Sequence, residues 1–493
     1  MRSIFFGLLL MAIANSSCQK KVLDIEPQDL LSSDLAFSTP EKIEAATLAT
    51  YEGLQSANFL SGRALIYVDL LGEDICDRNG FFVELPRYNL LANSGIAAGV
   101  WTAGYDAIVR ANRALAGITA NSSKLTTDKA GALIAECKFV RAVANFYLVN
   151  FFAQPYSFTA DASHIGIPLI TDSYTFNDPA ANKPRSSVSE VYTAIITDMT
   201  EALADLPLSY TGYNDNAYHN KTRGTKAAAS SFLSRIFLYK GDYANARKYA
   251  LDVINGAYGS FALNTAVNGA FGPGNYKTDE TIWSIPNNID DNPNTNNALP
   301  QHYYPTGKAD LMISPAFLNT ASNKFFLADD KRRSMIISGP GALSGLKFTN
   351  KYPDVASRGD WAPVIRYAEV LLTYAEAQAR TATGIDADAI DKLNVVRDRA
   401  KAFTTPSYMP GNFISKDELI AAILGERRIE LAFEGHRFWD LMRIKANVTN
   451  KYDGDGVNLL PDQPFGAQKN IFPIPQLEVD KSKKVLVQNP GYE

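Results

Sequence analysis

Apolar and polar residues follow one another along the chain with the period of an α-helix. Over most of its length apolar side chains recur every three or four residues, which places them on one face of a helix. This spacing predicts helices at 40–55, 101–118, 129–152, 189–204, 226–240, 243–255, 364–383, 385–400 and 416–444. Strictly alternating runs are short, and the best candidates for strands are 280–286 and 470–475. The pattern therefore predicts a mostly α-helical protein with little β-structure.

One predicted helix pair carries a repeat pattern. The stretch 232–255, FLSRIFLYKGDYANARKYALDVIN, turns at a Gly-Asp dipeptide and has small residues where two antiparallel helices would touch, as at Ala246 and Ala250. This arrangement is typical of a tetratricopeptide repeat. A single repeat cannot bury its own apolar face, so stacked neighbours are expected. The helix pairs at 101–152 and 364–400 have degenerate versions of the pattern.

Two long insertions separate the predicted helices, at 72–100 and 256–361. Asn, Asp, Pro and Gly dominate them, which favours turns over regular elements. Long loops in a compact protein are often functional, so we expect these two to carry a ligand site; the alternative is that they pack on the helices and bind nothing. The predicted organisation of the mature chain, 18–493, is a single domain. Its parts are a helical scaffold at about 36–255 and 364–447, the two insertions, and an extended C-terminal segment at 448–493.

The first residues have the form of an export signal. Arg2 precedes an apolar run at 4–13, which is too short for a membrane-spanning helix of about 20 residues. The small polar residues NSSC follow and end at Cys18, as in a bacterial lipoprotein processing site, although Asn15 stands where an aliphatic residue is usual. We therefore predict a signal peptide at 1–17 and lipidation of Cys18. The alternative is an ordinary secretory signal in which this cysteine is incidental.

Charge and residue content exclude several functions. The net charge of −4 provides no broad basic surface for nucleic acid. None of the four histidines is spaced with another for a zinc site, and the chain has no nucleophile elbow, P-loop or dinucleotide fingerprint. Two loops contain Asp and Asn side chains whose oxygens can act as calcium ligands: DGDG at 453–456 and NNIDDNPN at 287–294. Calcium is therefore the one cofactor for which the sequence offers a candidate site. Export would permit a disulfide between Cys76 and Cys137, and buried free thiols are the alternative.

The segment 426–441, ERRIELAFEGHRFWDL, has the residue types of an active site. Its acids and bases are also spaced as partners on a helix; Arg427, for example, lies three residues before Glu430. His436 and Asp440 share a face, but one histidine and one aspartate make a poor metal site. Buried ion pairs specify how an interior helix packs against its neighbours. We therefore interpret the segment as structural rather than catalytic.

The same segment, extended to ERRIELAFEGHRFWDLMRI, resembles the C-terminal signature of the SusD/RagB family of Bacteroidetes outer-membrane lipoproteins. The end of the chain, FPIPQLEVDKSKKVLVQNPGYE, is similar to that family's close, and VLDIEPQDL after Cys18 is similar to its beginning. Three internal stretches resemble its helices: GYDAIVRANRAL, AECKFVRAVANFYL and IRYAEVLLTYAEAQAR. The resemblance spans nearly the whole chain, in order.

The resemblance implies a scaffold of tetratricopeptide-like helix pairs whose variable loops carry the ligand site. It also implies a lipid-anchored protein exposed on the outer membrane, which covers a SusC-like TonB-dependent transporter and catches oligosaccharides for import without catalysis. Some relatives capture peptides instead, and the residues of the two insertions do not distinguish a glycan ligand from a peptide ligand. Two further alternatives are a surface glycoside hydrolase and a helical scaffold that holds a protein complex and binds no small ligand.

Sugar rings present C–H faces and hydroxyl rims, so a glycan site needs aromatic rings for the faces and polar groups for the rims. Both insertions have that composition, although no binding residue is transferred from the family by motif. The predicted ligand-binding residues are Asp77, Arg78, Asn79, Phe82, Tyr88, His302, Tyr303 and Tyr304, in which the phenylalanine and the three tyrosines provide the stacking rings. Trp101 and Trp283 are expected to fill the core, whereas the role of Trp361 is open.

Overall fold

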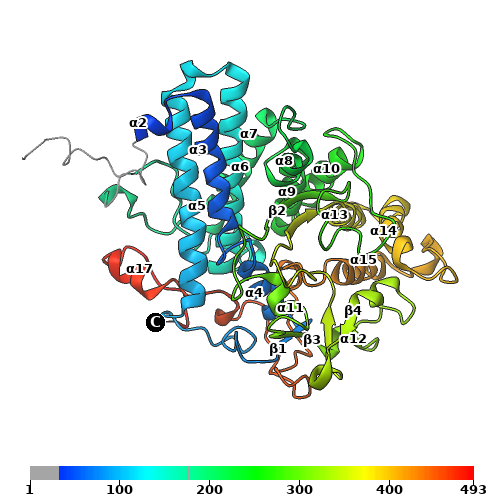
Figure 1. The fold of residues 1–493 in the computed structure, drawn as a ribbon. Helices are drawn as coiled ribbons and strands as arrows, with labels where there is room; N and C mark the ends of the chain where they lie inside the picture. The colour runs from blue at the N-terminus through cyan, green and yellow to red at the C-terminus, as the bar shows by residue number, and fades with distance from the viewer. Residues whose placement is uncertain (1–32, 175–177, 493) are drawn as a thin grey trace, which may run out of the picture.

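The structure is a computed structural model that describes residues 33–174 and 178–492. The predicted signal peptide and the lipid acceptor Cys18 lie outside the described residues. Three long helices stand side by side in Figure 1: α3 (Pro40–Gln55), α5 (Gly95–Ala120) and α6 (Thr127–Phe152). The Thr39 side chain caps α3 by accepting a hydrogen bond from the Lys42 N–H. The helix α7 (Val188–Asp205) packs against α6.

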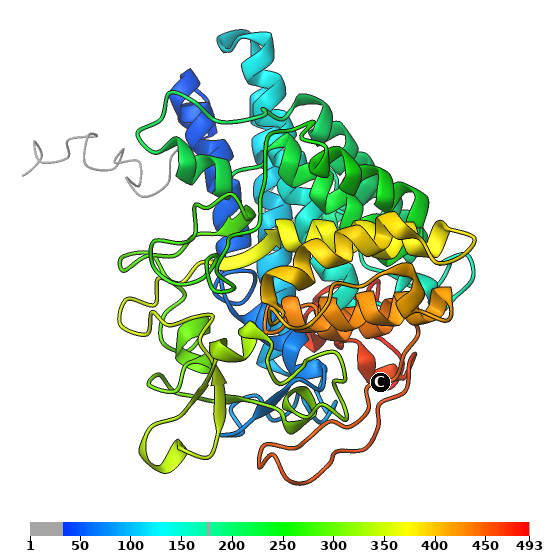
Figure 2. The same cartoon turned by 90° about the vertical axis from the view of Figure 1, so that its right-hand side faces the viewer.

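The predicted repeat pair is confirmed as α9 (Lys226–Lys240) and α10 (Tyr243–Ile254), which pack on each other. Between them Gly241 has a φ of +80°, the left-handed conformation in which glycine commonly ends a helix. Ala246 and Ala250 are fully buried, so the small residues do lie where the helices approach. In Figure 2, α13 (Tyr367–Thr381) lies between α10 and α15 (Lys416–Glu430). A further helix, α14 (Ala387–Ala400), packs against both α13 and α15.

The helix predicted at 416–444 is two helices, α15 and α16 (Arg437–Arg443). The chain leaves helical geometry between them, because Phe433 and Gly435 have φ values of +67° and +75°. The Gly435 N–H donates to the Asp69 carboxylate at 3.0 Å, and a Cβ at this glycine would lie 2.9 Å from the Leu65 Cα. The break is therefore imposed by close packing against α4 (Arg63–Leu71).

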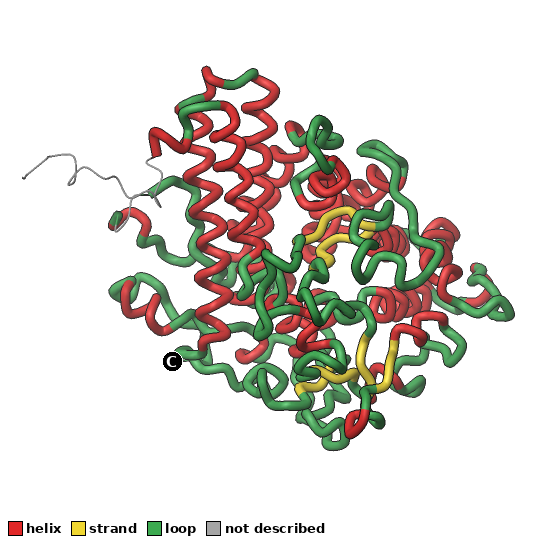
Figure 3. Tube along the Cα trace, viewed as in Figure 1, coloured by secondary structure: helices red, strands yellow, loops and turns green. Residues whose placement is uncertain are grey.

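In the described ranges the strands form three two-stranded antiparallel sheets. These pair β1 (Ile75–Asp77) with β3 (Leu311–Ile313), β2 (Thr281–Ile285) with β6 (Ala362–Arg366), and β4 (Ile336–Ser338) with β5 (Lys347–Thr349). The strand predicted at 280–286 is confirmed as β2. The helix predicted at 364–383 starts later, because its first residues pair in β6, and the segment 470–475 is not a strand. Figure 3 shows the loops gathered below the long helices.

The remaining helices are short. They are α2 (Ser33–Ala36), α8 (Asn216–Thr222), α11 (Leu299–Tyr303), α12 (Pro315–Leu318) and α17 (Gln476–Lys481). Among the described helices, none is long and apolar enough to cross a membrane. Trp101 and Trp283 are buried as expected, and the Trp283 indole donates to the Thr222 carbonyl at 3.0 Å. Cys76 and Cys137 are both buried free thiols in this structure.

Candidate functional site

The two insertions meet through the β1–β3 pair, which places their loops side by side. Beyond the end of β1, the Arg78 N–H donates to the Asp310 carbonyl at 2.7 Å and its Nε donates to the Ala309 carbonyl at 2.9 Å. The Asn79 amide donates to the Asp310 carboxylate at 2.9 Å and to the Lys308 carbonyl at 3.3 Å. The structure therefore brings together residues from both segments in which ligand contacts were predicted.

Asp77 shapes the turn after β1. Its carboxylate is buried and accepts the backbone N–H groups of Phe81 at 3.1 Å and Phe82 at 2.7 Å. Burial raises the pKa of Asp77 to about 6, in spite of these two hydrogen bonds. The prediction that Asp77 serves as a polar partner to a ligand needs correction, because both of its oxygens are used to fix the loop that carries the neighbouring rings.

Phe82 and His302 lie in the interior. Phe82 is 1% exposed and packs edge-on against Tyr67 at 5.9 Å between ring centroids. The His302 ring, 5.0 Å from Phe82, has no exposed surface, and its two nitrogens are bonded to the Asp310 carboxylate and the Asn296 carbonyl at 2.8 Å each. Neither side chain presents a face or a free polar atom to solvent, so the expectation that they contact a ligand is wrong in this structure.

Tyr88 and Tyr303 are also placed in the core. The Tyr303 ring is 1% exposed and its hydroxyl donates to the Asp69 carboxyl at 2.6 Å, while the Tyr88 hydroxyl donates to the Leu71 carbonyl. Burial of rings this large is strongly favourable once each hydroxyl has an acceptor. Their predicted stacking role is therefore corrected to core packing. Tyr304 is half-buried just beyond α11, and its role as a stacking ring stays a prediction.

The exposed ring at the junction is Phe81, which the sequence prediction missed. It is 41% exposed and rests edge-on against Phe82, with 4.8 Å between ring centroids. The Lys308 ammonium lies 3.8 Å from the centroid of this ring, and the Arg63 guanidinium lies 5.7 Å away. Phe81 therefore packs on the core through Phe82, has the Lys308 ammonium over its ring, and leaves 41% of its surface exposed to solvent.

Amide groups complete the surroundings of this ring. Asn296 is exposed; its side-chain oxygen accepts from the Lys308 ammonium at 3.1 Å and its carbonyl accepts from Arg63 at 3.2 Å. Asn79 is also exposed, on the other insertion. We call Phe81, Arg63, Asn79, Asn296 and Lys308 the Phe81 cluster. Its ring can stack on the C–H face of a sugar, and its amides and cations can hydrogen-bond the hydroxyl rim.

A second aromatic group lies around Trp361, just before β6. The Tyr276 and Trp361 rings are stacked, with centroids 5.2 Å apart and planes 11° apart, and Tyr218 meets Trp361 edge-on at 5.6 Å. Tyr218 is 36% exposed, whereas Trp361 is 9% exposed. The Tyr276 hydroxyl donates to the Asp360 carboxylate at 2.5 Å. This group therefore buries most of its tryptophan surface, whereas Tyr218 is exposed and Tyr276 is half-buried.

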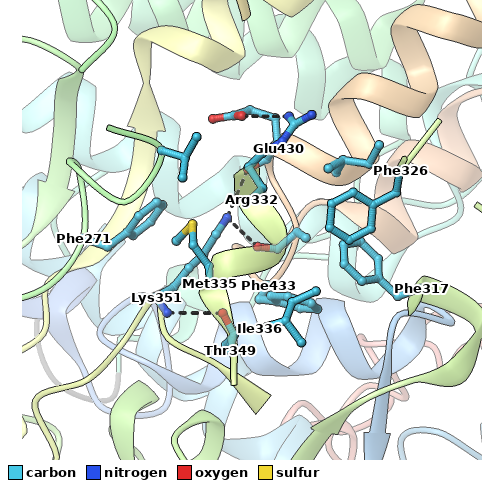
Figure 4. Close-up of a pocket in the computed structure, with 13 residues that line it drawn as sticks. Phe271, Phe317, Phe326, Arg332, Met335, Ile336, Thr349, Lys351, Glu430 and Phe433 are labelled. Atoms are coloured by element: carbon cyan, nitrogen blue, oxygen red, sulfur yellow. Dashed lines mark hydrogen bonds and ion pairs between the residues drawn. The ribbon is translucent and has the colours of Figure 1, made fainter. Parts of the chain in front are cut away.

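Figure 4 shows a small cavity between the insertion 256–361 and the end of α15 with the turn that follows it. Its volume is about 20 Å³, far below the roughly 300 Å³ of an ordinary ligand pocket and sufficient for about one water molecule. Its lining mixes rings with charges that are already paired, among them Phe271, Phe433, Arg332, Lys351 and Glu430. This cavity cannot hold a sugar ring.

The Glu/Arg-rich segment is structural, as its spacing predicted. Arg366, which ends β6, contacts Glu280 at 2.5 Å, Glu430 at 3.2 Å and Glu434 at 2.7 Å, and all four side chains are at most 3% exposed. Arg427 pairs with Asp440 at 2.8 Å in the same interior. The charges therefore tie α15 and the following turn to β6 and α13.

His436 and the acidic loops were the other candidates for chemistry. Burial lowers the pKa of His436 to about 4, which keeps its imidazole neutral. In the DGDG loop, Asp453 pairs with Arg87 at 2.7 Å and Asp455 accepts from Asn458. Within residues 33–174 and 178–492, no group of three or more His, Cys, Asp or Glu side chains is placed to hold a metal ion.

Comparison with known proteins agrees with this fold. The family profile described as "SusD family" matches residues 343–492, and the one described as "Starch-binding associating with outer membrane" matches residues 23–238. The chain is 25% identical to SusD-like protein P2 of Formosa agariphila, over 99% of both chains.

Solved structures give the same result. A SusD superfamily protein from Bacteroides fragilis superposes with a TM-score of 0.77 at 26% identity, covering 91% of this chain and 99% of that one. A laminarin-binding SusD-like protein has the same fold, with a TM-score of 0.71 at 21% identity over 92% of this chain and 100% of its own. The family is one of non-catalytic carbohydrate-binding proteins associated with the outer membrane. The chain belongs to the SusD family, as its tetratricopeptide-like scaffold, its buried Glu/Arg network and these matches show.

Proposed function

We propose that this protein captures an oligosaccharide at the Phe81 cluster and releases it chemically unchanged. The observation that carries the proposal is the exposed Phe81 ring at the junction of the two insertions, with the exposed amides Asn79 from one insertion and Asn296 from the other. A sugar face stacked on this ring would bring its hydroxyls within reach of amide donors and acceptors. Binding by stacking and hydrogen bonds needs no reactive group.

We further propose that the captured glycan passes to a SusC-like TonB-dependent transporter for import. A lipid on Cys18 would anchor the chain to the outer membrane at the cell surface. The membership of a family described as starch-binding and associating with the outer membrane supports this placement. The laminarin-binding relative supports a glycan rather than a peptide as the cargo.

Isothermal titration calorimetry of the protein starting after Cys18 tests the proposal. The panel contains plant, host and microbial oligosaccharides together with a peptide pool, and each glycan is incubated with the protein and assayed for new reducing ends. We expect saturable binding of one glycan class and no increase in reducing ends. Binding of peptides alone, or release of reducing sugar, would contradict the proposal.

A pull-down tests the proposed partner. The full-length lipoprotein, solubilised from outer membranes in mild detergent, should retain a TonB-dependent transporter. If the lipoprotein is recovered alone under conditions that preserve other outer-membrane complexes, the delivery step of the proposal is wrong.

A further inference from the structure

Two cations lie over the exposed ring of the Phe81 cluster. The Lys308 ammonium lies 3.8 Å and the Arg63 guanidinium 5.7 Å from the centroid of the Phe81 ring. Arg78, half-buried, is three residues before Phe81 and reaches back to the Ala309 carbonyl next to Lys308. The surface that a ligand would meet at this ring is therefore positively charged.

Two of these cations have no carboxylate partner among the residues that the structure describes. Arg63 donates to the Tyr67 hydroxyl at 3.3 Å and to the Asn296 carbonyl at 3.2 Å, and its buried Nε has no hydrogen-bond acceptor. The Arg78 guanidinium donates to the backbone carbonyl of Ala309. Guanidinium groups bind most strongly to oxyanions, often through two parallel hydrogen bonds, so both retain capacity for an anion.

Two acids lie near the ring, and both are buried and already engaged. Asp310 is 2% exposed and is bonded to Asn79 and His302, with the Lys308 ammonium 3.8 Å away. Asp77 is also buried, where it accepts two backbone N–H groups. The three cations are thus half-buried, with the Lys308 side chain 26% exposed, whereas both carboxylates are buried.

Elsewhere in the chain, buried arginines are matched with acids. Arg223 contacts Glu136 at 2.6 Å, and Arg141 contacts Asp198 at 2.7 Å. Arg63 is half-buried and has no carboxylate partner among the described residues, as is also true of Arg185 and Arg333, and it lies beside the exposed phenyl ring of the junction.

We propose that the glycan captured at the Phe81 cluster is anionic. It would carry a carboxylate or a sulfate ester next to the sugar ring that stacks on Phe81, where Arg63 and Lys308 bind the oxyanion. This inference rests on the proposed function, since it assigns the chemical class of the ligand at the same site. Carboxylate and sulfate present the same feature to the protein, a group of hydrogen-bond-accepting oxygens with a negative charge.

Matched pairs of oligosaccharides test the charge requirement by calorimetry at low and at moderate salt. One pair is an oligouronate and its carboxyl-reduced counterpart; the other is a sulfated galactan oligosaccharide and its desulfated counterpart. We expect the anionic member of one pair to bind at least tenfold more tightly than its neutral counterpart, with the difference shrinking as salt rises. The pair that shows the preference identifies whether carboxylate or sulfate is recognised.

Substitutions assign the preference to these residues. Arg63→Gln and Lys308→Gln should each reduce the affinity ratio of anionic to neutral ligand at least threefold, and Arg63→Lys should retain more of the ratio than Arg63→Gln. Lys277→Gln, which removes an exposed lysine paired with Asp215, is the matched control and should leave the ratio unchanged. Thermal unfolding of each variant confirms that it is folded.

The outcomes separate the inference from the proposed function. If neutral and anionic members bind equally well and Phe81→Ala weakens both, glycan capture stands and the anionic assignment is wrong. If the anionic preference persists undiminished in both glutamine variants, the assignment to Arg63 and Lys308 is wrong. If no glycan of any class binds, both the inference and the proposed function fail.

Discussion

Replacing Arg366 with methionine would remove the centre of the buried ion-pair network while keeping a side chain of similar length. Arg366 contacts three carboxylates, and after the substitution Glu434 keeps Lys351, 2.6 Å away, as its one ion-pair partner among the described side chains. Removing one member of a buried ion pair costs roughly 3–5 kcal/mol, because the charge left behind has lost its water as well as its partner. That is about a third of the stability of an ordinary protein.

Urea unfolding followed by tryptophan fluorescence measures this loss. The matched control is Lys277→Met, which breaks an exposed ion pair whose side chains are 43% and 47% exposed and should cost less than about 1 kcal/mol. Below its unfolding midpoint, the Arg366 variant should bind glycan as the wild type does. Equal midpoints for the two variants, or loss of binding in a folded Arg366 variant, would refute the structural interpretation of the Glu/Arg-rich segment.

Three further predictions follow from the same structure. Burial raises the pKa of Asp69 to about 8, so its protonated form stabilises the fold fully below about pH 4, and this contribution is lost as pH rises towards 8. In urea titrations across this pH window, the free energy of unfolding of the wild type should therefore fall by about 1.4 kcal/mol per pH unit relative to that of Asp69→Asn. Parallel pH dependences of the two proteins would contradict this prediction. Gly435→Ala should cost about 2 kcal/mol, since its φ is +75° and its Cβ would meet Leu65, while Gly384→Ala, which has open space, should stay within about 0.5 kcal/mol. Cys18→Ala should abolish fatty-acid labelling and release the protein from outer membranes; retained label would place the lipid elsewhere.

The helical scaffold could be predicted from the sequence because its signal is local. The predicted helices at 40–55 and 226–240 have the bounds of α3 and α9, since capping residues and apolar period coincide there. Where tertiary contacts override local preference, the prediction was wrong. The segment 416–444 keeps a helical pattern throughout, yet the chain breaks at Gly435 to reach Asp69, a residue more than 360 positions away.

The candidate site was predicted at the level of segments and mostly not at the level of side chains. Composition indicated that both insertions carry rings and amides, and the structure joins them through β1 and β3. Which of two adjacent rings faces solvent depends on the turn that Asp77 fixes, and this turn exposes Phe81 and buries Phe82. Tyr303 is buried because its hydroxyl finds Asp69, a partner from another part of the chain that no local pattern indicates.

The most direct test of glycan capture is the affinity of Phe81→Ala for the best oligosaccharide of the panel. The ring is 41% exposed, so a sugar could cover about 80 Å² of its roughly 200 Å², which corresponds to about 2 kcal/mol or roughly thirtyfold in affinity. Phe403→Ala is the control, since this fully exposed phenylalanine lies in the connection between α14 and α15. We predict a loss of about ten- to thirtyfold for Phe81→Ala and none for Phe403→Ala. Unchanged affinity in a folded Phe81→Ala protein would contradict the assignment of the ligand site to the Phe81 cluster.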